Sequence, residues 1–258
     1  MVTKWRLKSA AGSQRASLWQ LGPRPARWAR SAMSFMLVVV VCLGLGPRSG
    51  LSNQRVDLLL VVAIDVSGSV DRREFRLQRD GLATAFRHRA VVDAIRSGGA
   101  HGIAVTVVQW SGRDQQHVSV PWTVVRGAED AVRLADRVNK IERRFYKGIT
   151  HISGMINLGV QLTYAAPFAA ARRVIDVSGD GIDNVDYTPH RARDTAVALG
   201  VTVNGLAILN EIPDLGVYYR ATVVGGPGAF VINASDYDAY PAAILRKLIR
   251  EINRGFLS

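Results

Sequence analysis

Acidic and hydroxyl side chains follow the first strongly apolar segment of the chain at a spacing of two residues. The run VDLLLVVAI at 56–64 leads directly into DVSGS at 65–69, which supplies one carboxylate and two hydroxyls. Farther along, Thr150 precedes a helical pattern and Asp180 lies in the segment SGDG at 178–181. Oxygen ligands of this kind suit a hard divalent cation such as Mg²⁺ or, alternatively, Mn²⁺. The predicted ligands are Asp65, Ser67, Ser69, Thr150 and Asp180.

Alternating apolar and amphipathic segments predict the frame that would bring these residues together. Strands are expected at 56–64, 103–110, 118–125, 173–178, 201–209 and 230–233. Helices are expected at 72–96, at 128–141, from 152 onward, at 188–199 and at 237–252. This alternation predicts one α/β domain with a doubly wound, mostly parallel sheet and helices on both faces. Pro121 places the third strand at the sheet edge. Ligands bind such sheets beyond the carboxyl ends of the strands, where both acidic motifs fall.

The set of residues resembles the metal-ion-dependent adhesion site (MIDAS) of von Willebrand factor A domains. The resemblance covers about residues 55–254 and rests on DVSGS at 65–69, Thr150 and the GDG that contains Asp180. The segments VVQWSG at 107–112 and DVSGDG at 176–181 are similar to a bacterial branch of that superfamily whose function is unknown. The resemblance implies that the five predicted ligands hold one cation, and that an acidic group of a partner completes its coordination.

The mixture of hydroxyls and carboxylates favours binding over catalysis. Two directly bound carboxylates would neutralise a divalent cation, whereas neutral hydroxyls keep the ion attractive to an incoming anion. The expected partner is therefore a protein or peptide ligand that supplies an Asp or Glu carboxylate. Gly68 permits the tight turn that brings both serine hydroxyls inward. The candidates for the rim of the site are Gly68, Trp110, Asp183 and Asn184; the alternatives are packing at a strand end for Trp110 and solvated turn residues for Asp183 and Asn184.

Two other functions fit parts of the pattern. A carboxylate at the end of a first parallel strand also describes haloacid-dehalogenase-type phosphatases, which resemble DxDx(T/V) and use the second Asp as an acid–base group. Ser67 occupies that position here and has no suitable pKa for the role, so we expect no enzyme, with a Mg²⁺-dependent hydrolase as the alternative. The other alternative is a structural domain with an unoccupied metal site. In that case the serines and Thr150 would cap helices and Asp180 would be a turn residue.

The charge of the chain is concentrated before the predicted domain. The sequence contains 33 Lys and Arg against 21 Asp and Glu, a net charge of +12. Eight of the basic residues and none of the acidic ones precede Asn53, which leaves 25 against 21, or +4, from Asn53 onward. We therefore expect no nucleic-acid partner for the domain. The hydrophobic fraction of 48% and charged fraction of 21% exclude a disordered, collagen-like or coiled-coil chain.

Residues 1–52 have the features of an export signal. An uninterrupted apolar run, FMLVVVVCLGLG at 35–46, follows basic residues, as in a secretory signal. This run is short for a membrane-spanning helix, which needs about 20 residues. We expect a leader at 1–52 and an exported, periplasmic or secreted domain at 53–258, with an uncleaved membrane anchor at 35–46 as the alternative. Cys42, the single cysteine, lies in this run, which excludes a disulfide framework and a Cys-based zinc site.

Overall fold

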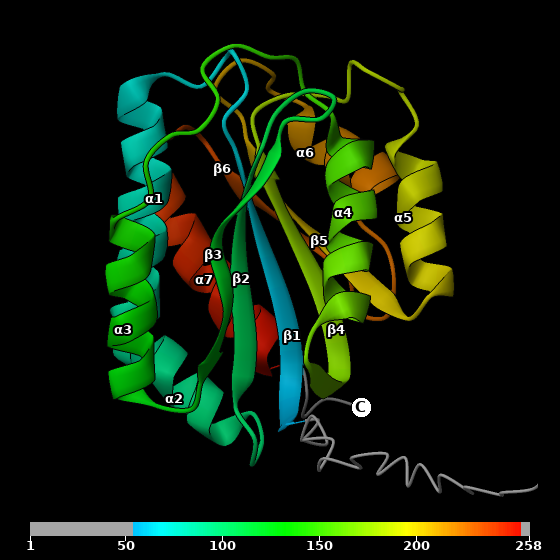
Figure 1. Ribbon diagram of the computed structural model, residues 1–258. Coiled ribbons are helices and arrows are strands. Elements are labelled where there is room, and N and C mark those ends of the chain that lie inside the picture. The colour runs from blue at the N-terminus through cyan, green and yellow to red at the C-terminus, as the bar shows by residue number, and fades with distance from the viewer. Residues whose placement is uncertain (1–53, 254–258) are drawn as a thin grey trace, which may run out of the picture. The chain divides into compact units, whose positions relative to one another are not determined.

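A six-stranded sheet with helices on both faces forms the fold of residues 54–253, the part of the chain that the computed structural model describes (Figure 1). The strands are β1 (Gln54–Asp65), β2 (Ile103–Trp110), β3 (Gln116–Val125), β4 (Phe168–Gly179), β5 (Val201–Ile208) and β6 (Val231–Ala234). The helices are α1 (Arg72–Arg87), α2 (Arg89–Ser97), α3 (Ala128–Asn139), α4 (Ile152–Ala165), α5 (Pro189–Ala198), α6 (Leu215–Tyr218) and α7 (Tyr240–Asn253), and the π-helical turn η1 spans Tyr219–Val223.

The strand order, β3-β2-β1-β4-β5-β6, confirms the expected doubly wound sheet. The central strand β1 pairs in parallel with both β2 and β4, and β5 and β6 continue the parallel arrangement. Only β3 runs antiparallel, at the edge that Pro121 predicted. Strand order reverses between β1 and β4, and such switch points open a crevice at the carboxyl ends of the strands.

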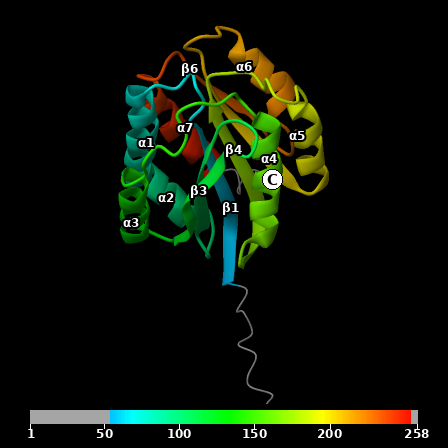
Figure 2. The same ribbon diagram turned by 45° about the horizontal axis from the view of Figure 1, so that its top comes forward.

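Two helical layers bury the sheet from both sides. α1, α2, α3 and α7 cover one face, and α4, α5 and α6 cover the other (Figures 1 and 2). The apolar run of β1 is buried because it faces both layers: Leu60, Val62 and Ile64 pack toward the first, whereas Val61 and Ala63 pack toward the second. This two-sided burial explains why β1 shows no alternation of polar and apolar residues.

The helix predicted at 72–96 is wrong in one respect, because the chain breaks it at His88. His88 is extended, with φ −68° and ψ 133°, so α1 ends before it and α2 begins after it. Its Nδ1 accepts a hydrogen bond of 3.1 Å from the N–H of Ala90, which caps α2. No Gly or Pro lies at this point in the sequence, and the apolar spacing continues across it, so the pattern gave no sign of the break.

Smaller differences concern the ends of elements. β4 begins at Phe168, five residues before the expected start, and α7 begins at Tyr240 rather than at residue 237. The helical segment at 215–223, which comprises α6 and η1, was not predicted because its short apolar stretches carry no helical period. None of these differences changes the sheet topology.

The predicted leader at 1–52, including the apolar run at 35–46, lies outside the described residues. Among the helices of residues 54–253, none combines the length and the apolar character that crossing a membrane requires.

A fully buried cluster of charged side chains joins α7 to the sheet. Lys247 on α7 lies 2.7 Å from Asp176 Oδ1 on β4 and 2.5 Å from Glu251 Oε1, one helical turn away. Asn204 on β5 donates to the same oxygen of Glu251 at 3.0 Å. All three charged side chains have no exposed surface. Lys247 therefore supplies positive charge to both buried carboxylates of the cluster.

Candidate metal centre

The turn after β1 presents its acidic and hydroxyl side chains to one point. Asp65, the last residue of β1, is completely buried, and its Oδ1 accepts a hydrogen bond of 2.7 Å from the N–H of Ser67. The hydroxyls of Ser67 and Ser69 lie 3.2 Å apart. Neither serine caps the next helix, because Asp71 forms the N-cap of α1 in a capping box with Glu74. The serine hydroxyls are thus directed to the same place as the Asp65 carboxylate.

Asp180 reaches this turn from the end of β4. Its Oδ1 accepts a hydrogen bond of 2.9 Å from the hydroxyl of Ser69, across 111 residues of sequence. Only 1% of Asp180 is exposed. The contact arises because β1 and β4 are parallel neighbours, with Ile64 paired to Ser178, so both strands deliver their following turns to the same edge.

Thr150 lies at the same edge, in the loop before α4. A methyl group built on Gly181 would lie 3.2 Å from Thr150 Oγ1, so the hydroxyl packs against the residue that follows Asp180. Two hydrogen bonds with Asn184 fix the Thr150 backbone: its N–H donates to Asn184 Oδ1 at 2.8 Å, and its carbonyl accepts from the Asn184 N–H at 3.0 Å. The structure therefore brings together side chains from all three predicted segments, and Figure 2 shows their loops at one end of the sheet.

The loop between α3 and α4 braces the turn after β1 through Arg143. Its Nη2 donates to the carbonyls of Ser67 at 2.9 Å and Val66 at 3.2 Å, and its Nε donates to the carbonyl of Phe145 at 2.7 Å. Gly68 donates its N–H to the Gly148 carbonyl at 2.9 Å. A side chain on Gly68 would lie 3.1 Å from that carbonyl oxygen. Gly68 has no positive φ, so close approach, rather than an unusual turn conformation, requires glycine there.

The residues predicted for the rim divide into two groups. Gly68 and Asn184 are exposed, so their assignment to the rim stays a prediction. Trp110 has no exposed surface and packs in the core, so the prediction that it lines the rim is corrected. Asp183 is also buried, with 1% exposed, and its rim assignment is likewise corrected. Both corrections have the same cause: the strand end and the turn fold inward against the helix layer of α4 and α6.

Asp183 holds the loop after β4 against the start of α4. Its Oδ2 accepts from the N–H of Ser153 at 2.8 Å and from the Ser153 hydroxyl at 2.6 Å. Its Oδ1 accepts from the N–H groups of Val185, Asp186 and Tyr187, each at 3.1 Å. Burial alone would raise the pKa of Asp183, but these hydrogen bonds outweigh it and lower the pKa. Asp183, and not Thr150, therefore caps α4.

Two buried carboxylate oxygens at the site form no hydrogen bond of normal geometry with any described residue. They are Asp65 Oδ2 and Asp180 Oδ2. Burial, followed by repulsion from Asp180, raises the pKa of Asp65 to about 8. The charged form of Asp65 is therefore disfavoured when no cation is bound. A divalent cation would pair both oxygens and offset the repulsion, so the residues present fit the ion that their types predict.

Two tyrosines that the sequence analysis did not single out lie close to these carboxylates. Burial, followed by the charge of Asp65, raises the pKa of Tyr219 well above its usual value. Burial, followed by the charge of Asp180, likewise raises the pKa of Tyr237. A side chain on Gly179 would lie 2.8 Å from the Tyr219 hydroxyl and 2.9 Å from Asp65 Oδ2. Because Gly179 has no side chain, the neutral Tyr219 hydroxyl can approach the Asp65 carboxylate.

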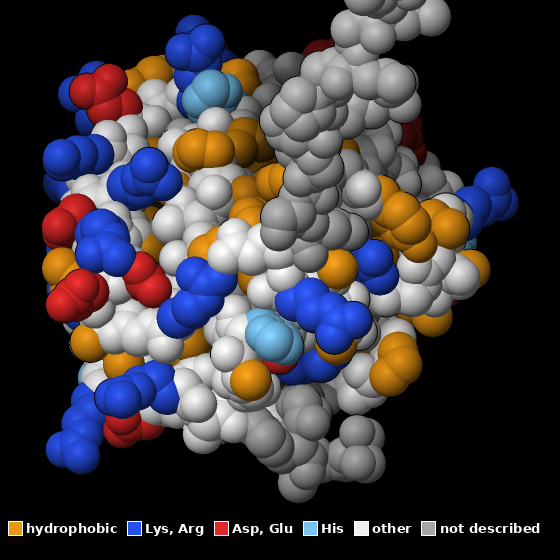
Figure 3. All heavy atoms as spheres, turned by 60° about the horizontal axis from the view of Figure 1, so that its bottom comes forward, with side chains coloured by type: hydrophobic (Ala, Val, Ile, Leu, Met, Phe, Trp, Pro, Cys, Tyr) orange, Lys and Arg blue, Asp and Glu red, His pale blue; other side chains and the backbone are white. Residues whose placement is uncertain are grey.

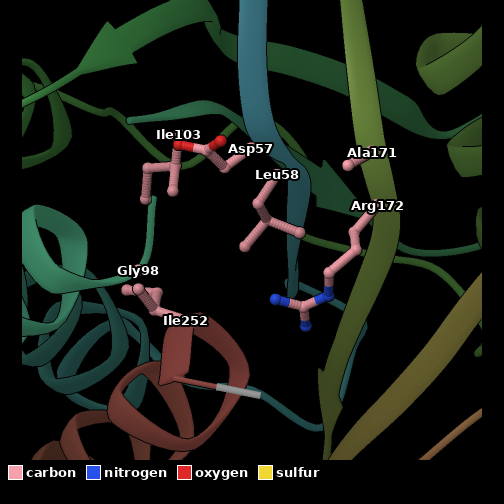
Figure 4. A pocket seen from close by; sticks show the side chains of 7 residues that line it. All are labelled: Asp57, Leu58, Gly98, Ile103, Ala171, Arg172 and Ile252. Carbon is pink, nitrogen blue, oxygen red and sulfur yellow. The ribbon is translucent and has the colours of Figure 1, made fainter. Parts of the chain in front are cut away.

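No cluster of three or more His, Cys, Asp or Glu side chains suited to a metal occurs in residues 54–253. The hydroxyl-rich site is consistent with this, since only two of its predicted ligands are carboxylates. Two cavities lie at the opposite end of the sheet, where Figure 3 shows basic, acidic and apolar side chains on the surface. One of about 160 Å³ lies between the start of β1 and the end of α7 (Figure 4). There Arg172 donates to the Glu251 carbonyl at 2.7 Å, a favourable contact for a cation near a helix C-terminus.

Comparison with known families identifies the chain. Residues 55–256 match the family described as "Protein of unknown function (DUF1194)". The chain belongs to the DUF1194 family. Among curated proteins, none is detectably similar in sequence to this DUF1194 chain.

Solved structures show the fold of this DUF1194 domain. Proximal thread matrix protein 1 from the mussel byssus, with a zinc-occupied MIDAS motif, has a TM-score of 0.53 and 16% identity, over 76% of this chain and 48% of that chain. The pilus adhesin SpaC from Lactobacillus rhamnosus GG has a TM-score of 0.53 and 14% identity, over 79% of this chain and 30% of that one. The vWF domain of the pilus tip protein Mfa5 from Porphyromonas gingivalis has a TM-score of 0.51 and 11% identity, over 78% of this chain and 96% of that one.

The DUF1194 domain thus has the von Willebrand factor A fold, which confirms the resemblance predicted from the motifs. At these identities the similarity concerns the fold alone. The DUF1194 chain spans about half the length of the mussel matrix protein and less than a third of SpaC.

Replacing Asp183 by alanine is expected to lower the free energy of unfolding of the DUF1194 domain by about 3 kcal/mol, because it leaves the buried Ser153 N–H and hydroxyl without an acceptor. The pKa of Asp183 is lowered in the folded state. Its contribution is therefore present above the unfolded pKa of about 4 and is lost as pH falls through the folded pKa. Urea denaturation at pH 7 and at decreasing pH measures this. The free energies of unfolding of wild type and Asp183→Ala should become equal in acid.

The exposed Asp194 on α5 supplies the control for this comparison. Asp194→Ala removes a carboxylate whose ion pair with Arg193 is exposed, so the free energy of unfolding should change by less than about 0.5 kcal/mol. A loss equal to that of Asp183→Ala would contradict the role assigned to Asp183.

Proposed function

We propose that Asp65, Ser67, Ser69, Thr150 and Asp180 bind one Mg²⁺ or Mn²⁺ ion, and that this ion captures an Asp or Glu carboxylate of a protein partner. The observation that carries the proposal is the pair of buried oxygens, Asp65 Oδ2 and Asp180 Oδ2, which form no hydrogen bond of normal geometry with any described residue. They lie beside hydroxyls that already form a continuous chain, from Ser67 through Ser69 to Asp180. An arrangement of this kind is stabilised by a cation.

The carboxylate and hydroxyl ligands would have different roles. The carboxylates would hold the ion, and the hydroxyls would leave it attractive to a partner's carboxylate. Asp65 and Asp180 supply negative charge from a water-poor environment, where their attraction for a cation is strong. Ser67, Ser69 and Thr150 supply neutral oxygens, which leave net positive charge on the ion. Arg143 holds the turn after β1 by donating to the backbone carbonyls of Val66 and Ser67 and not to the Asp65 carboxylate. It therefore orders the ligands without competing with the ion for them. The bound ion supplies the positive charge that attracts the partner's carboxylate.

Two relatives in fold support the adhesive part of the proposal. One structure of the mussel matrix protein has a zinc-occupied MIDAS motif, and SpaC is a pilus adhesin. For the present site we expect an exposed metal ion to capture a carboxylate. This is the simplest chemistry that the types of its ligands permit. Nothing in its geometry supplies the second acid–base group that a phosphatase of the DxDx(T/V) type needs, because Ser67 stands at that position.

We also propose that the domain is exported, because residues 35–46 and the basic residues before them have the pattern of a secretory signal. Cell fractionation of the tagged full chain tests this part. Recovery with the periplasm, medium or membrane supports export, and recovery with the cytoplasm contradicts it.

Metal-dependent capture of a carboxylate is tested with the full chain and defined peptides. The wild-type chain is titrated with MgCl₂ or MnCl₂, and its melting temperature should rise as the ion binds the native state. A labelled peptide with one central Asp in a Gly–Ser background should then bind in Mg²⁺ and be released by EDTA. The same peptide with Asn at the centre is the control and should not bind. Equal binding of both peptides, or binding that EDTA does not reverse, would contradict the proposal.

A further inference from the structure

Large exposed apolar side chains gather in the two loops that carry Thr150 and Asp180. Eight large apolar residues of the described chain are exposed, and four of them lie in these loops. They are Tyr146 (58% exposed), Ile149 (53%), Ile182 (38%) and Tyr187 (67%), here termed the apolar rim. Single exposed apolar residues need no explanation, but a group beside a binding site is typical of an interaction surface.

Each member of the apolar rim either lies near a predicted ligand in the sequence or contacts a residue that holds the loops of the site. Ile149 directly precedes Thr150, and Ile182 is two residues after Asp180. The Tyr146 ring packs on Arg143, whose guanidinium carbon is 5.2 Å from the ring centroid and whose Nη2 holds the Ser67 carbonyl. Tyr187 donates its N–H to Asp183. The loops that carry the predicted ligands Thr150 and Asp180 therefore also carry the apolar rim.

Buried polar side chains fix both loops. Gln109 donates to the Glu142 carbonyl at 2.9 Å and accepts from the Arg144 N–H at 2.9 Å, so it holds the loop before α4. Gln115 donates to the Lys147 carbonyl at 3.2 Å. Asp183 holds the loop after β4 in the same way, through five hydrogen bonds. The apolar rim is thus presented by ordered backbone, which lowers the entropy lost when a partner binds.

The charges beside the apolar rim favour an acidic partner. Arg144 and Lys147 are exposed in the same loop as Tyr146 and Ile149, and neither forms an ion pair with any described residue. The loop also contains the exposed acidic residue Glu142, so its basic residues, which include Arg143, are in excess. Both remain available to an incoming carboxylate, as does the proposed metal ion. A purely apolar segment would leave this positive charge uncompensated, whereas an acidic segment would steer toward it.

We propose that the segment recognised at the metal centre carries a large apolar residue directly beside its metal-binding Asp or Glu, and that this residue packs on Tyr146, Ile149, Ile182 and Tyr187. This inference rests on the proposed function and adds the side-chain class next to the carboxylate. Burial of one Leu or Phe side chain accounts for a preference of about tenfold or more.

The experiment compares peptides that share a central Asp and differ only in whether Phe, Leu or Ser flanks it. Binding to the full chain is measured in Mg²⁺ and in EDTA. Wild type should bind the Phe and Leu peptides about tenfold more tightly than the Ser peptide. The variant Tyr146→Ser/Ile149→Ser should lose this preference while it keeps Mg²⁺-dependent binding of the Ser peptide and the Mg²⁺-induced rise in melting temperature. The control Val132→Ser/Leu199→Ser removes exposed apolar side chains of α3 and of the C-terminus of α5, and should keep the preference.

The other outcomes each overturn the inference in a recognisable way. Equal Mg²⁺-dependent binding of Ser and Phe peptides overturns it and leaves the proposed function intact. If Phe peptides with Asn in place of the central Asp bind equally well in EDTA, the apolar rim binds a purely apolar ligand, and the inference is overturned. A dimer of the full chain in sedimentation that Tyr146→Ser/Ile149→Ser dissociates would assign it to a second copy. Absence of Mg²⁺-dependent binding for every peptide overturns the inference together with the proposed function.

Discussion

Replacement of Lys247 by methionine is expected to lower the free energy of unfolding by about 3–5 kcal/mol. The ammonium group lies 2.7 Å from Asp176 and 2.5 Å from Glu251, and all three side chains are completely buried. Methionine fills nearly the same volume but leaves two buried carboxylates without a cation. Burial, with a contribution from the charge of Glu251, raises the pKa of Asp176 to about 7 despite the attraction of Lys247. Urea denaturation of the metal-free chain at pH 7 measures the loss.

Two further variants separate the loss of charge pairing from a general effect on α7. Arg246→Met changes an exposed neighbour on the same helix and should shift the free energy of unfolding by less than about 0.5 kcal/mol. The triple variant Asp176→Asn/Lys247→Met/Glu251→Gln removes every charge of the cluster and keeps the side-chain shapes, so it should recover more than half of the loss. A loss below about 1 kcal/mol for Lys247→Met alone would show that water reaches the cluster and that its charges are not truly buried.

Replacement of Asp65 by asparagine is expected to abolish stabilisation by Mg²⁺ and to leave the metal-free domain at least as stable as wild type. The asparagine oxygen still accepts the Ser67 N–H, and the repulsion between two buried carboxylates disappears. At a Mg²⁺ concentration 100 times the dissociation constant, wild type should gain about 2.7 kcal/mol, and the variant should gain nothing. Thermal and urea denaturation with Mg²⁺ or EDTA give both numbers.

The matched control is Asp114→Asn, which removes an exposed carboxylate at the same end of the sheet. Asp114 has a φ of 59°, a conformation that asparagine adopts readily, so the loop should be unaffected. This variant should retain the full response to Mg²⁺. Destabilisation of Asp65→Asn by the same amount with and without Mg²⁺ would show that Asp65 supports the fold instead of the ion.

Together the two predictions separate the stability of the domain from its binding. Lys247 and its carboxylates lie between α7 and the sheet, whereas Asp65 is the last residue of β1 and Asp180 directly follows β4. Asp176 and Asp180 belong to the same short segment of chain, yet Asp176 pairs with Lys247 and Asp180 bonds to Ser69. We therefore expect Lys247→Met to alter stability at every Mg²⁺ concentration, and Asp65→Asn to alter only the Mg²⁺-dependent part.

The position of the predicted ligands could be inferred from sequence because apolar runs predict where the strands end. The continuous apolar run of β1 predicted a strand buried on both faces, and the polar residues that follow it had to lie at its carboxyl end. The same reasoning applied to β4 and Asp180. Parallel neighbours deliver their turns to one edge, so the contact between Ser69 and Asp180 follows from topology. Thr150 followed similarly from its place at the start of α4.

The side chains that surround the ligands could not be inferred in this way. Arg143 supports the turn through backbone carbonyls 76 and 77 residues away, and no spacing in the sequence marks such a contact. Tyr219 reaches Asp65 from a π-helical turn that periodicity did not predict. Asp183 and Trp110 looked like rim residues because their types are common at binding sites, but the fold buries both.

The sequence by itself determined the α/β class, the strands that end in oxygen-bearing side chains and the chemistry of those side chains. These features are encoded locally, in apolar runs and in the residues that directly follow them. Only the tertiary structure decided that Asp183 caps α4, that Lys247 pairs with two buried carboxylates, and that Tyr146, Ile149, Ile182 and Tyr187 stand exposed beside the site. Burial and pairing depend on which segments pack together, and these segments can be a hundred or more residues apart in the sequence. The type of a single residue does not indicate which distant segment it will contact.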